Sequence, residues 1–130
     1  MRYAAMLATA AALLLPVGAF AADLRVEISA AQIAARSGSR NVFAIDDIHE
    51  RMQASINCLV GPKGADFVAS VRNPCATTGN GVIPDTPEQA KKDQYMQVVT
   101  KLKSGLKLDD RAAAMQIALD AADMIVATSE

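Results

Sequence analysis

The chain has no tryptophan, one histidine and two cysteines, and aromatic residues make up only 4% of its 130 residues. One histidine and two cysteines cannot supply the four ligands of a closed zinc site of the Cys/His type. The sequence lacks a CxxCH motif, which excludes covalent haem attachment. Basic and acidic residues are nearly balanced, at 13 and 14, so the clustered positive face that nucleic-acid binding requires is not expected.

Long apolar runs are also missing, apart from one at the N-terminus. Residues 4–17 are apolar but too few to cross a bilayer core of ~30 Å as a permanent anchor. Arg2 gives the run a positive start, and Ala19-Phe20-Ala21 places small residues at the positions that a signal peptidase reads. We therefore expect residues 1–21 to be a cleaved signal peptide, with an uncleaved anchor as the alternative.

The predicted signal peptide indicates where the mature protein is located. The alanine-rich signal is typical of bacteria, so the mature protein, residues 22–130, is predicted to be periplasmic or secreted, with no stable membrane insertion after processing. Without Arg2 it carries 12 basic residues against 14 acidic ones. Its length suits one small domain.

Both cysteines, Cys58 and Cys75, fall in the predicted mature chain. Two thiols in a small exported domain most often pair, so a disulfide is expected, with free thiols or half of a metal site as alternatives. The bond would close a loop of about 18 residues, worth about 3 kcal/mol from lost chain entropy. Cys58 lies off the apolar stripe of its predicted helix, which suits a bond to a loop folding back over that helix.

Apolar residues recur at three- and four-residue spacing over most of the mature chain, which predicts an all-α fold. Thr86-Pro87-Glu88-Gln89 has the pattern of a helix start, with threonine as N-cap. A further capping box at Ser29–Gln32 predicts a short helix ending at Gly38, and residues 24–28 alternate as a short strand would. We expect a bundle of three to four helices, the clearest at 43–60, 86–105 and 109–127.

The long connection 61–85 is dense in turn-forming residues. Such a connection is uncommon in a small bundle and is often functional or pinned. Its candidate binding loop consists of Thr77, Thr78, Gly79, Asn80 and Gly81, whose backbone amides could face an anion, although the lysine of a phosphate-binding loop is missing. The alternative is a stapled crossover that compensates for a small core.

His49 is the other candidate for chemistry. It borders the apolar stripe one turn from Met52, and a helical bundle can hold haem or a metal between a histidine and a methionine. A histidine at such a boundary is more often simply packed or solvated, and methionines at helical spacing are more often core residues. Nucleophilic catalysis would need His49 as its base, with a serine or threonine brought from elsewhere, so no catalytic site is evident.

The sequence thus favours a small exported binding or interaction protein, accessory, inhibitor-like or chaperone-like, with a protein partner in the envelope and no cofactor. The alternative is a small metal- or haem-binding helical protein that uses His49 and a methionine. The sequence alone leaves its oligomeric state open.

Processing gives the first test. Mass spectrometry of the abundant form from the native host should show a chain that begins at Ala22 or Asp23, because cleavage is expected after Ala21 or one residue later. Retention of residues 1–21 in that form would contradict the export prediction.

Overall fold

The computed structural model describes residues 22–130; the predicted signal peptide, residues 1–21, lies outside the described residues. Within 22–130 the chain is helical and contains no strand, which confirms the predicted all-α class. Four long helices and one short one follow in the order α1 (Leu24–Ser37), α2 (Ile45–Val60), α3 (Val82–Asp85), α4 (Gln89–Gly105) and α5 (Arg111–Ser129).

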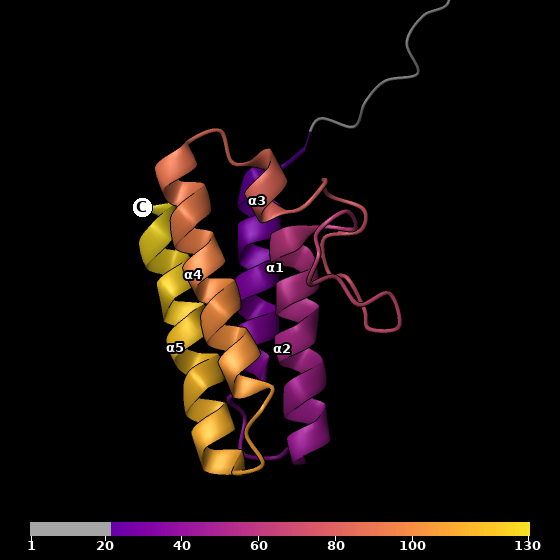
Figure 1. Cartoon of the computed structure of the whole chain (residues 1–130), viewed down its shortest axis with the longest axis vertical. Coiled ribbons are helices and arrows are strands. Elements are labelled where there is room, and N and C mark those ends of the chain that lie inside the picture. The colour runs from indigo at the N-terminus through magenta and orange to yellow at the C-terminus, as the bar shows by residue number, and fades with distance from the viewer. Residues whose placement is uncertain (1–21) are drawn as a thin grey trace, which may run out of the picture.

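The four long helices form an up-down-up-down bundle (Figure 1). Around the bundle, α1 packs on α2 and α5, and α4 packs on α5 and α2. The short α3 sits over one end, where it contacts α1, α2 and α4. The long connection 61–81 leaves the end of α2 and returns to this same end before α3 begins. No described helix is long and apolar enough to cross a membrane.

Alanines fill much of the interface between α1 and α5. Both helices turn small side chains inward, so their backbones can approach closely. Larger side chains from α2 and α4 fill the rest of the core. The fully buried set includes Ala31, Ala35, Ala118, Ala121, Ala122, Met52, Ile56, Leu59, Val98 and Leu102.

The first helix begins earlier than predicted. Asp23 is its N-cap and accepts a hydrogen bond from the Val26 amide at 3.3 Å. The expected strand at 24–28 is therefore wrong, and Ser29 lies inside α1 instead of capping it. The short alternation at 24–28 is equally compatible with a helix, because Glu27 and Ala31 continue one buried face at four-residue spacing.

Thr86 was expected as the N-cap of the next helix, but it is instead the C-cap of α3. Its hydroxyl donates to the Val82 carbonyl at 2.6 Å, and α4 begins at Gln89 with Glu88 as N-cap. The last helix is likewise capped by Asp110, which accepts from Ala113 N at 2.7 Å, and not by Asp109. These errors arise because a cap is defined by backbone geometry that neighbouring polar residues can equally satisfy.

The predicted disulfide between Cys58 and Cys75 is present, with 4.9 Å between the two Cα atoms. Its surroundings differ from the expectation, because both cysteines are fully buried and belong to the core cluster. The loop and the neighbouring helices together cover the last two turns of α2, where every residue from Ala54 to Val60 is buried. Near the end of α2, Asn57 and Cys58, which lie off the apolar stripe, are therefore interior residues.

Reduction of the disulfide tests its role as a staple. We expect a lower melting temperature, by an amount equivalent to about 3 kcal/mol at most, because the unfolded chain regains the entropy of the closed loop. Far-ultraviolet circular dichroism should change little, while proteolysis should speed up between Val60 and Pro84. The Cys58→Ala/Cys75→Ala protein, treated with the same reductant, controls for the reductant itself. Two alkylatable thiols in the native, air-exposed protein would contradict this account.

Candidate functional site

One buried asparagine organises the first half of the long connection. The Asn57 side chain, on α2, donates to the carbonyls of Val68 and Val71 at 2.9 and 3.0 Å. Its Oδ1 accepts from the Val68 amide at 2.9 Å. Asn57 is fully buried, whereas the sequence pattern places it on the polar side of the helix. A side chain that satisfies several loop backbone groups at once fixes the path of an otherwise irregular segment.

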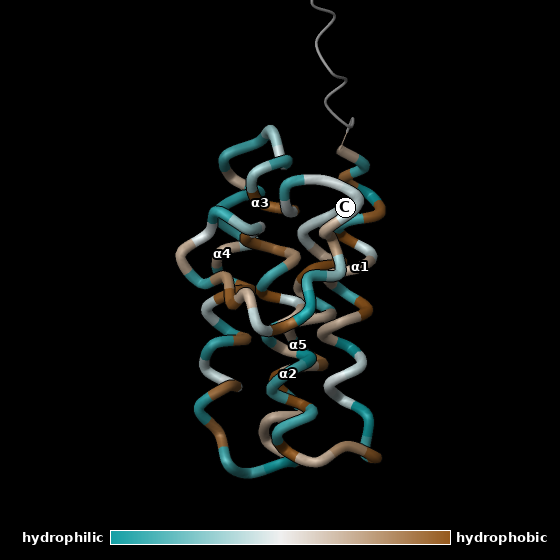
Figure 2. Tube along the Cα trace, turned by 90° about the vertical axis from the view of Figure 1, so that its right-hand side faces the viewer, coloured by the Kyte–Doolittle hydropathy of each residue, from teal (hydrophilic) through white to brown (hydrophobic). Residues whose placement is uncertain are grey.

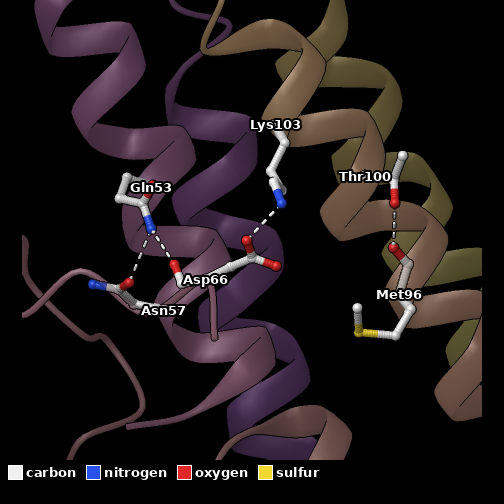
Figure 3. A network of polar contacts seen from close by, with 6 residues as sticks. All are labelled: Gln53, Asn57, Asp66, Met96, Thr100 and Lys103. Atoms are coloured by element: carbon white, nitrogen blue, oxygen red, sulfur yellow. Dashed lines mark hydrogen bonds and ion pairs between the residues drawn. The ribbon is translucent and has the colours of Figure 1, made fainter. Parts of the chain in front are cut away.

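A second polar network ties the same loop to α2 and α4 (Figure 3). Gln53 donates to the Asn57 Oδ1 at 3.1 Å and to the Asp66 carbonyl at 3.0 Å. The Asp66 carboxylate pairs with Lys103 of α4 at 2.6 Å. The loop is thus held by two helices besides the disulfide.

Glu27 is the least expected residue of this end of the bundle. Its side chain is fully buried, and its Oε1 accepts from the Gly81 amide at 2.9 Å. The disulfide packs against the same residue, since the sulfur atoms of Cys58 and Cys75 lie 3.3 and 3.6 Å from the Glu27 carbonyl oxygen. Nothing in the sequence distinguishes Glu27 from a surface glutamate in the first turn of a helix.

The segment 79–85 closes around this carboxyl group. Asp85 accepts from the Asn80 amide at 2.7 Å and from the Asn80 side chain at 3.0 Å. A Cβ atom built on Gly79 would overlap Glu27 Oε1 and lie 2.6 Å from Asp85 Oδ2. Gly79 is therefore the residue across which the two carboxyl groups approach each other.

The two carboxyl groups are shifted in opposite directions. Burial, together with the neighbouring charges of Asp85 and Asp23, raises the pKa of Glu27 to about 7, despite the hydrogen bond from Gly81. Burial also disfavours ionisation of Asp85, but hydrogen bonds from Asn80 and from Glu27 outweigh it and lower the pKa of Asp85. Near neutral pH, Asp85 is the charged member, and Glu27 holds a proton part of the time.

The predicted binding loop is only partly available at the surface. Thr77 and Asn80 are exposed, Thr78 and Gly79 are half-buried, and Gly81 is buried. The amides of Asn80 and Gly81, which could have faced an external anion, are already bonded to Asp85 and Glu27. In the structure these amides face the chain's own carboxyl groups.

His49 lies near the beginning of α2, far from this cluster, and Met52 lies in the middle of the helix. The His49 Nε2 lies 3.0 Å from the Leu108 carbonyl oxygen, in the connection between α4 and α5. Met52 is fully buried in the core. Among the described residues, no three His, Cys, Asp or Glu side chains gather as metal ligands would. In this arrangement His49 joins α2 to the connection between α4 and α5.

A shallow apolar groove runs along the outward side of α1, where hydrophobic positions recur in Figure 2. Val26 is 44% exposed and Ile33 is 63% exposed, with Ala30 between them at helical spacing. Pro74 of the pinned loop continues the groove beside Ile33. Arg25 and Arg72 border it, and neither forms an ion pair within residues 22–130.

In comparisons with known proteins, the chain matches no protein-family model, and it has no significant match among curated proteins or solved structures.

Gly79→Ala tests the carboxyl cluster. The added methyl group meets Glu27 and Asp85, so we expect a loss of about 1–3 kcal/mol in the free energy of unfolding, measured by urea denaturation. The matched control is Thr77→Ala in the same loop, whose exposed side chain should cost less than about 0.5 kcal/mol. Equal stability of the two variants would show that the close approach across Gly79 does not constrain the fold.

Proposed function

We propose that the protein is a small exported binding protein of the bacterial envelope, which holds a protein partner in the groove between α1 and its disulfide-pinned loop. The observation that supports this proposal most is the apolar strip on α1, where Val26 and Ile33 are exposed and Ala30 is half-buried between them, while the other side of the helix is buried in the core. Exposed apolar side chains gathered into one groove are more typical of an interaction surface than the same residues scattered singly.

The pinned loop gives the groove a rigid wall. Pro74 precedes a disulfide-bonded residue, and the Asp23 amide at the start of α1 donates to the Thr78 carbonyl at 3.0 Å. The loop therefore contacts α1 near the groove's first end and borders it again at Pro74. A surface that is already ordered loses little conformational entropy on binding, which favours recognition.

Two arginines at the border of the strip indicate which side chains the partner would carry. Arg25 and Arg72 border the apolar strip and have no acidic partner within the described chain. Arginine is well suited to pair with carboxylates at the rim of an interface. We therefore expect the bound segment to present apolar side chains to Ile33 and Val26, flanked by aspartate or glutamate.

A photo-crosslinking residue at position 33 tests this proposal. Crosslinked partners from the native envelope should map to an apolar segment with flanking acidic residues, and a synthetic peptide of that segment should bind the purified protein. Ile33→Asp should weaken the peptide by at least tenfold, because it places a charge in the apolar contact, and Arg72→Glu should weaken it through like-charge repulsion.

The control is Val42→Asp, which changes an 81% exposed hydrophobic residue in the connection between α1 and α2. It should leave peptide affinity unchanged. Three results would contradict the proposal: crosslinks to a second copy of this chain, a mapped segment without acidic residues, or equal effects of Ile33→Asp and Val42→Asp.

A further inference from the structure

A fully buried carboxyl group and a half-buried one, from different elements, meet at one end of the bundle. Glu27 comes from α1, and Asp85 is the last residue of α3; both carboxyl groups lie against Gly79, where a Cβ atom would meet Glu27 Oε1 and Asp85 Oδ2. Glu27 Oε1 is bonded to the Gly81 amide, whereas its buried Oε2 receives no hydrogen bond from any donor of the described chain. Asp85 is an acceptor when ionised, so a hydrogen bond between the two carboxyls requires a proton.

No positive charge compensates this pair. Asp85 and Asp23 are the charged groups that act on Glu27, and both are acidic. Arg25 lies two residues before Glu27 and so points to the other side of α1, where it borders the groove. The side of α2 facing Glu27 contributes the disulfide.

The charged side chains of α5, which also packs on α1, are engaged elsewhere or exposed. Asp123 pairs with Arg36, Asp120 with Lys101, and Arg111 donates to the Asn41 carbonyl. Glu130, which follows α5, is exposed. Ionised Glu27, itself fully buried, would therefore face the half-buried Asp85 carboxylate without a counter-charge, an arrangement that the burial of Glu27 makes costly.

We propose that Glu27 and Asp85 form a proton-operated latch that closes the segment 78–86 onto α1 while Glu27 is protonated and loosens it when Glu27 ionises. In the closed state, the protonated Glu27 carboxyl donates to Asp85 and still accepts from the Gly81 amide. In the loosened state, the two carboxylates repel each other and water reaches both. The inference stands on this cluster alone and does not depend on whether the neighbouring groove binds a partner.

The direction of the pH response follows from proton binding. The closed state holds a proton on Glu27 up to a pKa of about 7, whereas a solvated glutamate releases it near 4.5. Between these values the closed state binds more protons, so its extra stability is fully present below about pH 4.5 and is lost as the pH rises towards 7. The lowered pKa of Asp85 acts in the opposite direction, but only below its ordinary value of 3.8.

Movement should be confined to a short part of the chain. Cys75 is held by the disulfide, and the bonds of Asn57 and Gln53 hold the preceding part of the loop without involving Glu27. On the other side, α4 begins at Gln89. Loosening therefore exposes the backbone of 78–86, including the Gly81 amide, and leaves the four long helices in place.

Nuclear magnetic resonance of the wild-type protein between pH 4 and 9 tests the latch. The side-chain carboxyl carbon of Glu27 should titrate with a midpoint near 7. Hydrogen-exchange protection factors, which are already corrected for intrinsic exchange, should fall at least tenfold for the Gly81 and Thr86 amides between pH 5.5 and 8. The amides of Val98 and Val99 in α4 should keep theirs.

Glu27→Gln removes the titrating proton but keeps an acceptor for Gly81 and gains a donor for Asp85, so the Gly81 amide should stay protected at every pH. Glu50→Gln, an exposed glutamate of α2, is the matched control and should retain the wild-type response. Should Glu27→Gln fail to fold, Asp85→Asn serves instead: removing the neighbouring charge should lower the Glu27 midpoint by at least half a pH unit.

Four results would overturn the latch: a Glu27 midpoint near 4.5, pH-independent protection of Gly81 in the wild type, a Glu27→Gln response like that of the wild type, or a Glu27 midpoint unmoved by Asp85→Asn. If protection changed with added calcium and not with pH, a bound cation and not a proton would control the segment, and the latch would also be overturned.

Discussion

The buried Glu27 carboxyl is the contact on which the loop end of the bundle depends. It receives the Gly81 amide, lies beside Asp85 and sits on the helix that the disulfide packs against. A carboxyl group without solvent is costly to ionise, and a buried Gly81 amide without an acceptor is costly as well. The hydrogen bond between them lowers both of these costs. Because Gly81 joins the pinned loop to α3, this bond holds the loop and α3 against α1.

The other end of the connection relies on a neutral group. Asn57 offers both donors and an acceptor, so it can satisfy loop carbonyls and an amide at once without any change of charge. The disulfide separates this neutral anchor from the titratable one. The long connection therefore has a part anchored by a buried neutral amide, next to a part anchored by the titratable Glu27.

The features that could be predicted from the sequence are those set by local periodicity and cysteine chemistry. The all-α class and the Cys58–Cys75 bond follow from these signals. The roles of Glu27 and Asn57 could not be predicted, because burial of a polar residue is decided by what folds over it from elsewhere in the chain. Asn57 falls on the polar side of its predicted helix and Glu27 falls in a segment expected as a strand, yet both side chains are fully buried in the folded chain.

The packing of the pinned loop on α1 explains why the groove lies next to the Glu27–Asp85 cluster. The loop turns Glu27 inward on one side of α1, and its residue Pro74 extends the groove on which Val26 and Ile33 remain exposed. Arg25 lies on the outward side and cannot neutralise Glu27 through the helix. Because Arg25 faces outward, it is available to the acidic partner proposed above, and for the same reason Glu27 has no positive charge beside it. Because the latched segment bonds to Asp23 at the first turn of α1, a change in Glu27 protonation acts directly beside the surface proposed for the partner.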